Sequence, residues 1–231
     1  PEYAVFVTAF HHGMPDYASV YAIPGAVSEK YGFRKYGFHG LSYQYVSHRA
    51  SVLLKRPLDQ LKLVMCHLGT GGSSVCAFEN GRTLDTSMGY SPLAGLIMST
   101  RSGDIDPEIL LELIRKGYSV DAIEKMLNFD SGLIGISDYS SNLGEIFDAA
   151  GENDACRLAF EAYVHRLKKT IGAFLFLMNG ANALIFTDDA GERFYQVREA
   201  VCKDTDWFGL QLDPALNRAA VGHQEKQISA E

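Results

Sequence analysis

The sequence predicts an α/β fold, and three observations lead to that prediction. Three strand-like runs follow one another between Lys62 and Ser87, separated by short turns that contain glycine. A long helical pattern covers Asp154–Met178. A buried strand-like run, Ala183–Thr187, follows that helix directly. Strands that alternate with helices in this way are typical of a sheet with helices packed on its faces.

The composition excludes several classes of partner. Of 231 residues, 47% are hydrophobic and 21% are charged, so the chain can bury a globular core. A net charge of -7 without a long basic run argues against nucleic-acid binding. The longest apolar run, Ile171–Met178, is too short to cross a membrane. We therefore expect neither nucleic acid nor membrane as a partner.

The four cysteines indicate a reducing compartment. They are widely spaced and form no Cys-x-x-Cys pair, which argues against a zinc site. Nothing in the sequence marks secretion, so we expect reduced thiols and a cytoplasmic location. The chain begins with proline and runs at once into a strand-like segment, so we expect a fragment of a longer protein.

The first 60 residues are expected to contain a strand, an aromatic segment rich in turns, and a helix. The strand is predicted at Ala4–Thr8 and the helix at Ser42–Leu54. Ser42 can cap the first turn of this helix, and Arg56-Pro57 ends it.

A three-stranded meander is expected next. Its strands are Lys62–His67, Ser73–Phe78 and Arg82–Ser87. Gly69–Gly72 forms the first turn, and Asn80-Gly81 has the composition of a tight hairpin turn. This segment places a glycine-rich turn at the end of a buried strand.

Helices dominate the remainder of the chain. Asp106 and Pro107 are a typical helix start, with Ile109, Leu110, Leu113 and Ile114 expected to face inward and Gly117 to end the helix. Further helices are predicted at Ser119–Leu127, Asp154–Met178 and Phe194–Cys202, with a polar turn at Asp188–Gly191. After Pro214 the pattern fades, and residues 222–231 look polar and loose.

This order of elements resembles the nucleotide-binding fold of actin, hexokinase and Hsp70, which is ribonuclease H-like. In that fold the first hairpin turn and later strand–helix turns close on the phosphates of a nucleotide. We assign residues 1–60 to the C-terminal end of a first lobe, which is only partly present. Residues 61–231 form a second, nucleotide-side lobe that is mostly present but is expected to lack its last strand.

Two segments have the chemistry of a phosphate site. The glycines after His67 let backbone amides approach an anion, although glycine-rich hairpin turns are also common without function. No Gly-Lys-Ser/Thr follows, so the turn is not a Walker A loop. Downstream, Arg101 and Asp104 precede Asp106, which we expect to be a helix cap. Arginine suits a transferring phosphoryl group because its donors form a planar fork.

Other polar residues are more ambiguous. His39 lies between a glycine turn and a helix start, where it could point into a cleft, but an isolated histidine is more often a packed or surface residue. His11-His12 lacks further metal ligands. Asp188 and Asp189 follow a buried strand, at the end where α/β sheets bind ligands, yet a plain polar turn is equally consistent. Two carboxylates there would repel a phosphate unless a cation intervened.

These motifs, in this order, closely resemble the acetate kinase family, which includes the propionate kinases. The residues that carry the resemblance are Thr8–Pro15, Tyr36–Gly40, Cys66–Gly69, Asn80-Gly81, Asp85–Gly89, Thr100–Pro107, Ser131–Leu133 and Phe186-Thr187. The resemblance implies reversible phosphoryl transfer from ATP to acetate or propionate, giving an acyl phosphate and ADP. It also implies Mg²⁺ and a homodimer.

The resemblance assigns roles position by position. Arg101 corresponds to the arginine that stabilises the phosphoryl group, His39 to a histidine that assists it, and Val7 to the position of the catalytic aspartate. The positions that correspond to nucleotide-binding residues are His67, Leu68, Gly69, Thr70 and Gly71 on the phosphate side, and Asn142, Leu143, Gly144, Asp189, Ala190, Gly191, Glu192 and Arg193 on the adenosine side. No metal ligand is assigned within the chain.

Departures from the family pattern leave three functions open. Val7 cannot accept a proton or bind a metal. Thr70 stands where the family has an asparagine. The family motif Gly-Ile-Gly-Glu-Asn is replaced by Asp-Ala-Gly-Glu-Arg at Asp189–Arg193. The chain is either part of an acetate or propionate kinase, a relative with another phosphoryl donor such as pyrophosphate, or a non-catalytic copy. We rank them in that order, and we expect the chain alone to show no appreciable kinase activity.

Overall fold

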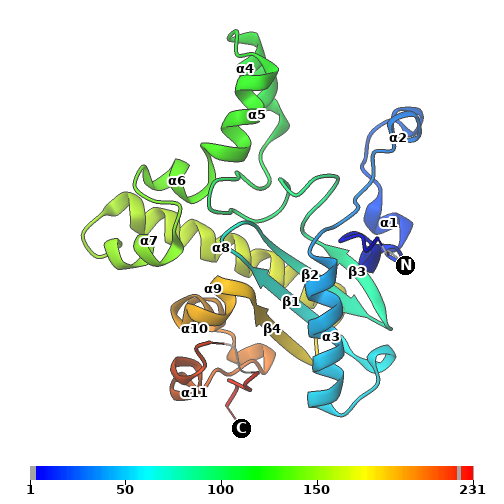
Figure 1. The fold of residues 1–231 in the computed structure, drawn as a ribbon, viewed down its shortest axis with the longest axis vertical. Coiled ribbons are helices and arrows are strands. Elements are labelled where there is room, and N and C mark those ends of the chain that lie inside the picture. The colour runs from blue at the N-terminus through cyan, green and yellow to red at the C-terminus, as the bar shows by residue number, and fades with distance from the viewer. Residues whose placement is uncertain (1–3, 223–224, 231) are drawn as a thin grey trace.

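The structure, a computed structural model, describes residues 4–222 and 225–230. A four-stranded sheet lies at its centre with strand order β3-β2-β1-β4 and helices on both faces (Figure 1). β1 is antiparallel to β2 and parallel to β4, and β3 is antiparallel to β2. This arrangement confirms the predicted α/β architecture.

The strands are β1 (Lys62–Leu68), β2 (Ser73–Glu79), β3 (Arg82–Thr86) and β4 (Ala183–Thr187). The α-helices are α1 (Asp16–Ser19), α2 (Gly25–Tyr31), α3 (Gly40–Leu54), α4 (Pro107–Arg115), α5 (Val120–Phe129), α6 (Gly132–Ser137), α7 (Leu143–Ala149), α8 (Asp154–Leu177), α9 (Asp188–Arg193), α10 (Tyr195–Cys202) and α11 (Pro214–Ala219). The described residues also form three 3₁₀ helices: η1 (Ala9–His11), η2 (Leu58–Gln60) and η3 (Asp206–Phe208).

The two faces of the sheet are buried by different helices. Along β1, Leu63 and Met65 belong to the apolar cluster that includes α3, whereas Val64 and Cys66 belong to the cluster that includes α8. Successive side chains of a strand point to opposite faces, so one strand contributes to both clusters. A strand buried on both sides is mostly apolar, and β1 has the apolar run Leu63–Cys66 between Lys62 and His67.

The long helix α8 forms most of one layer. Tyr163, Leu167, Ile171 and Phe174 are buried, in agreement with the predicted helical stripe. Cys66, Cys76, Cys156 and Cys202 are all free and buried within these layers. Burial raises the pKa of the Cys76 thiol to about 12 and that of Cys202 to about 11.

The expected strand Ala4–Thr8 is wrong. Residues 4–6 have no regular structure, and Val7 and Thr8 lie in a turn before η1. Val5 and Phe6 are 65% and 69% exposed, and no strand of the described sheet pairs with them. A strand-like composition requires a neighbouring strand to form a ladder, and the sequence does not show whether one is present.

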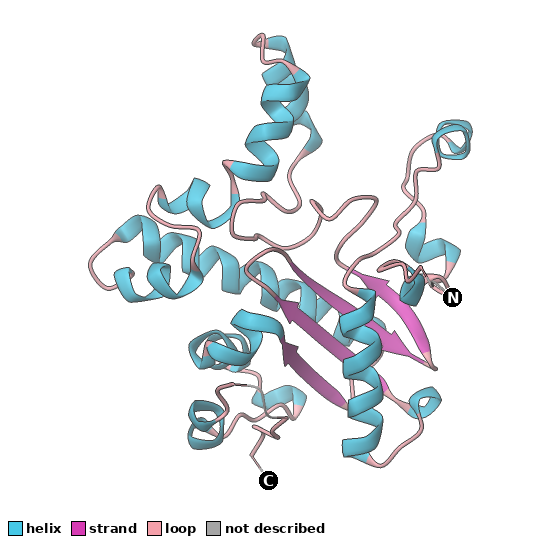
Figure 2. Cartoon of the chain, viewed as in Figure 1, coloured by secondary structure: helices cyan, strands magenta, loops and turns pink. Residues whose placement is uncertain are grey.

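The helix that begins after Asp106 has the predicted start but not the predicted burial. The Asp106 carboxylate accepts a hydrogen bond from the amide of Glu108, and Pro107 occupies the first turn. No residue of α4 is buried, and Ile109 and Ile114 are 47% and 49% exposed, which corrects the inward orientation. α4 and α5 pair as an arm that extends from the body of the molecule (Figure 2).

The C-terminal segment is more ordered than predicted. Asp213 caps α11 by accepting from the amides of Ala215 and Leu216. The amide of Asp213 donates to the carbonyl of Ile228, so residues 225–230 include a segment that returns to this helix. His223, Gln224 and Glu231, which belong to the predicted loose tail, lie outside the described residues. None of the helices in the described ranges is long and apolar enough to span a membrane.

Candidate active site

The parallel pair β1 and β4 brings two of the predicted segments to one edge of the sheet. His67 of β1 pairs in register with Thr187 of β4. The glycine turn follows β1, and α9 follows β4. The turn is closed by hydrogen bonds between the backbones of Gly69 and Gly72 in both directions. The turn after His67 and the start of α9 therefore lie side by side, as expected for parallel strands.

Arg101 faces this turn from the loop between β3 and α4. A Cβ placed on Gly72 would lie 3.0 Å from Nη1 of Arg101 and 3.6 Å from Nε2 of His39. A larger residue at Gly72 would therefore displace both groups. Within residues 4–222 and 225–230, the Arg101 guanidinium makes no hydrogen bond or ion pair, so its donors are available to a ligand. It lines a cavity of about 290 Å³ with Thr70, Gly71, Asn142 and other residues.

His39 stands at the start of α3, with its ring beside Arg101. Its backbone is left-handed, with φ 60°. Nδ1 lies 2.8 Å from the hydroxyl of Ser74, which also bonds to the Tyr43 hydroxyl. The buried Tyr43 hydroxyl has no other acceptor among the described side chains, so Tyr43 donates to Ser74 and Ser74 donates to Nδ1 of His39. The ring proton of His39 is then on Nε2, the nitrogen nearest Gly72.

The environment keeps His39 uncharged. Burial, reinforced by the nearby His67 and Arg101, lowers the pKa of His39 to about 3, although Asp188 opposes the shift. A neutral ring near pH 7 is a hydrogen-bond donor through Nε2–H rather than a source of a labile proton. His39 also stacks on His67, with ring centroids 3.9 Å apart.

His67 links the site to α3 and to α9. Its Nδ1 is 2.9 Å from the Ser42 hydroxyl, and its Nε2 is 2.7 Å from Oδ2 of Asp188. Burial lowers the pKa of His67, while the Asp188 carboxylate raises it. The expected cap at Ser42 is wrong, because α3 begins at Gly40, whose amide donates to the carbonyl of Val7.

That same hydrogen bond places Val7 beside the site. Gly40 N lies 2.9 Å from the Val7 carbonyl oxygen, so Val7 adjoins the backbone of His39. A Cβ on Gly40 would lie 2.2 Å from this oxygen, so the close approach requires glycine. Val7 is 45% exposed, and its side chain offers no polar atom to the site.

The two predicted adenosine-side segments, at the start of α7 and in α9, lie close together. Their residues mostly cap a helix or pack against a neighbour. Asn142 caps α7 with its side-chain oxygen, which accepts from the amides of Gly144 and Glu145. A Cβ on Gly144 would lie 2.6 Å from the ring of Phe194, which joins the start of α7 to the end of α9. The other predicted residues that are buried here are Leu68, Leu143, Ala190 and Gly191.

The acidic segment before Phe194 forms a helix rather than the expected turn. Oε1 of Glu192 accepts from the Thr187 hydroxyl and the Asp188 amide, which stabilises the first turn of α9. Asp189 and Arg193 form an exposed pair with 3.8 Å between Oδ1 and Nε. Asp189 Oδ2 is also 3.4 Å from the Thr70 hydroxyl.

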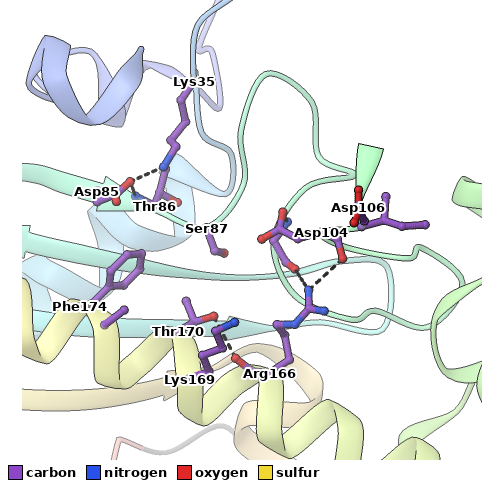
Figure 3. Close-up of a pocket in the computed structure, with 13 residues that line it drawn as sticks. Lys35, Asp85, Thr86, Ser87, Asp104, Asp106, Arg166, Lys169, Thr170 and Phe174 are labelled. Carbon is purple, nitrogen blue, oxygen red and sulfur yellow. Dashed lines mark hydrogen bonds and ion pairs between the residues drawn. The ribbon is translucent and has the colours of Figure 1, made fainter. Parts of the chain in front are cut away.

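Asp104 is not part of the Arg101 cavity. Oδ1 of Asp104 accepts from the Gly95 amide, and the residue lines a second cavity, of about 370 Å³, with the Lys35–Asp85 ion pair (Figure 3). In Figure 3, Arg166 reaches from α8 to the backbone carbonyl of Asp104. The structure therefore separates the two residues that sequence reasoning paired.

The histidine pair has a structural explanation. His11 is buried, with Nδ1 2.9 Å from the Thr83 hydroxyl and Nε2 2.9 Å from the Phe38 carbonyl, whereas His12 is exposed. In the described part of the chain, no three or more His, Cys, Asp or Glu side chains gather closely enough to hold a metal ion.

Known proteins with similar sequences identify the family of this chain. The family model described as the acetokinase family matches residues 1–231. The chain belongs to the acetokinase family. The acetate kinase of Moorella thermoacetica is 47% identical over 232 residues, covering 100% of this acetokinase chain and 58% of the relative. The acetate kinase of Bacillus subtilis is 47% identical over 219 residues, covering 94% of the chain and 55% of the relative.

Solved structures of acetokinases share the fold. The acetate kinase of Porphyromonas gingivalis superposes with a TM-score of 0.93 at 41% identity, covering 98% of this chain and 57% of that one. A propionate kinase of Francisella tularensis gives a TM-score of 0.87 at 38% identity. The match covers 93% of this chain and 56% of the propionate kinase chain. The acetokinase chain thus spans little more than half the length of these relatives. These similarities confirm the predicted family and the nucleotide-binding type of fold.

Sequence reasoning did not assign roles to Ser74, Tyr43 and Asp188 in this site. The sequence could have indicated Ser74, because this residue lies opposite His67 in the predicted hairpin. It could also have indicated Asp188, since this residue directly follows a strand parallel to β1. Tyr43 has no such signal, because its contact with Ser74 depends on how α3 packs on the sheet.

Proposed function

We propose that this chain is the phosphoryl-handling part of a kinase that transfers a phosphoryl group reversibly between ATP and acetate or propionate. The observation that carries the proposal is Arg101, an unpaired cation within the described residues, pointed at the glycine turn that follows His67. Such a pairing of guanidinium and open amides suits a phosphate group.

In this proposal each group has a distinct task. Phosphoryl transfer needs positioning and charge neutralisation more than covalent help from the protein. Arg101 would neutralise charge on the transferring group, and the neutral His39 would donate its Nε2–H to the same group. The turn His67–Gly71 would offer amides to the nucleotide phosphates, and a Cβ placed on Gly71 would meet no atom within 4 Å.

The adenosine side is proposed from position and from the family. Asn142 lines the same cavity as Thr70, Gly71 and Arg101, which supports a nucleotide that extends from the turn toward α7. Leu143, Gly144 and residues Asp189–Arg193 would form its walls. Mg²⁺, a homodimer and a cytoplasmic location are carried over from the family. Residues 4–222 and 225–230 provide no carboxylate cluster for the metal, so we derive no step through it.

Binding of ADP to the chain tests this function. We expect Arg101→Ala to weaken ADP binding about tenfold, because a charge-assisted contact to phosphate is lost. Isothermal calorimetry measures the change, and Arg115→Ala, on the exposed arm, is the matched control that should bind as the parent does. Absence of ADP binding in all three proteins would contradict the proposal.

Two further measurements separate the alternatives. Pyrophosphate that binds in place of ADP, with the same loss in Arg101→Ala, would favour another phosphoryl donor. Because Val7 cannot serve as the family aspartate, we expect no appreciable acyl phosphate from the chain in a hydroxamate assay with ATP and acetate. The relatives named above are acetate and propionate kinases, which supports ATP as donor and either carboxylate as acceptor.

A further inference from the structure

The carboxylate of Asp188 lies against the glycine turn. Oδ2 lies 2.7 Å from Nε2 of His67, and a Cβ placed on Gly69 would lie 2.6 Å from the same oxygen. The side chain of Asp188 is 35% exposed, so the carboxylate is at the mouth of the turn rather than deep in the core. The turn therefore already has an anionic group on its phosphate side.

We propose that Asp188 acts as an internal competitor for phosphate, holding a carboxylate at the turn and weakening the binding of phosphate-bearing ligands there. This inference rests on the proposed function, because it presumes that the turn after His67 is where phosphates bind. It makes Asp188 a determinant of ligand affinity rather than a catalytic residue.

The local backbone does not require a carboxylate at this position. Asp188 has φ 67°, in the left-handed region that glycine adopts without strain. The side chain is instead held by partners at both oxygens, because Oδ1 accepts from the Asp189 amide at 2.7 Å and Oδ2 is in contact with Nε2 of His67. A glycine would fit the backbone here and would vacate the mouth of the turn.

The surrounding charges do not cancel that of Asp188. Burial lowers the pKa of His67, so this partner is neutral near pH 7 and contributes no positive charge. Asp189 adds a second carboxylate, 3.4 Å from the hydroxyl of Thr70 in the same turn. Asp189 is paired with Arg193, 3.8 Å away. The charge of Arg101, which faces the turn at Gly72, would therefore have to offset the Asp188 carboxylate as well as the phosphates.

Two variants of Asp188 test the inference. Asp188→Gly removes the carboxylate and relaxes the backbone, whereas Asp188→Asn keeps the shape and removes the charge. Asp204→Gly is the matched control, because Asp204 is an exposed aspartate with φ 60°. Calorimetric titration of each protein with ADP, in the presence of a chelator so that no divalent cation bridges the anions, gives the affinities. Titration with adenosine serves as the phosphate-free comparison.

We expect Asp188→Gly and Asp188→Asn to bind ADP about tenfold more tightly than the parent, with unchanged adenosine binding and no change in Asp204→Gly. Equal ADP affinity in the parent and both Asp188 variants would overturn the inference and leave the proposed function standing. Failure of all four proteins to bind ADP would overturn both.

A second readout does not depend on any ligand. The Asp188 carboxylate raises the pKa of His67, so its replacement by asparagine should lower that pKa further. Proton NMR of the histidine rings follows this change in the folded variants. A His67 pKa that is the same with and without the carboxylate would show that the contact is absent in solution, and the inference would fail.

Discussion

His39 illustrates how much a single residue depends on partners far away in the sequence. Its Nδ1 meets Ser74 on β2, its ring stacks on His67 of β1, and its Nε2 is directed toward Gly72. Burial, together with the nearby His67 and Arg101, favours the neutral ring. Sequence reasoning could place His39 before a helix, but its protonation state follows only from the assembled neighbours.

The low pKa of His39 predicts a pH dependence of stability. In the unfolded chain a histidine titrates near 6.5, whereas the folded pKa is about 3, so the unfolded state binds more protons between these values. The contribution of His39 is complete above pH 6.5 and is lost as the pH falls toward 3. From pH 7 to pH 4 we expect His39 to account for about 3 kcal/mol of the lost free energy of unfolding.

Urea unfolding at pH 7 and pH 4 measures this effect. His39→Asn should show a smaller loss than the parent by about that amount, since asparagine tolerates left-handed backbone and does not titrate. His165→Asn, which alters an exposed histidine of α8, is the control and should retain the parental pH dependence. Identical pH dependence in parent and His39→Asn would show that His39 is already protonated when folded at pH 4, or is not buried.

At the scale of elements, caps and turns could be predicted well, and burial could not. Asp106 caps α4 as expected, Ser119 caps α5 at the predicted start of that helix, and Asn80 and Gly81 both have positive φ in their hairpin turn. The apolar pattern of α4 was predictable, but its periodicity does not reveal which surface covers it. α11 was missed although Asp213-Pro214 repeats the signal that identified the start of α4.

The helices α9, α10 and α11 are held together by one buried arginine. Arg198 is 2% exposed, and its guanidinium donates to the Asn217 side chain and to the carbonyls of Gly191, Glu192, Asn217 and Ala220. These acceptors lie at the ends of short helices, where carbonyls otherwise lack partners. Arg198 therefore stabilises the segment that contains the proposed adenosine wall.

Loss of Arg198 should loosen this segment. We expect Arg198→Met to lower the free energy of unfolding by about 3 kcal/mol, because several buried carbonyl oxygens lose their donor. Guanidinium chloride unfolding followed by circular dichroism measures the loss. Arg218→Met, an exposed change on α11, should stay within about 0.5 kcal/mol of the parent. A similar small effect for both variants would mean that water replaces the guanidinium without cost.

At the scale of the whole molecule, the two apolar layers on either side of the sheet determine the fold. The sequence predicted a sheet with helices packed on its faces, because strand-like runs alternate with helical patterns and α8 has a clear apolar stripe. The parallel pairing of β1 and β4 then places the turn after His67 and the segment after Thr187 at one edge. The contact between Asp188 and the turn was not predictable, since it depends on the left-handed backbone at that residue. The assignment of residues 1–60 and 61–231 to two lobes stays a prediction.

The layer formed by α8 provides a test of this description. Leu167 is fully buried against the sheet, and Leu158 on the same helix is 58% exposed. We expect Leu167→Ala to lower the free energy of unfolding by about 3 kcal/mol through lost burial and a residual cavity. Leu158→Ala, the same chemical change on the solvent side, should cost less than about 0.5 kcal/mol. Thermal and denaturant unfolding compare the two variants, and equal losses would contradict the assigned faces of α8.

The burial of all four cysteines determines how unfolding of this chain can be observed. Trp207, the single tryptophan, is 77% exposed, so its fluorescence reports little of the transition. The thiols are shielded in the native layers and become accessible only when those layers separate. Labelling with a thiol-specific reagent therefore counts opened molecules directly, and the chain carries its own probe of cooperative opening without an added dye.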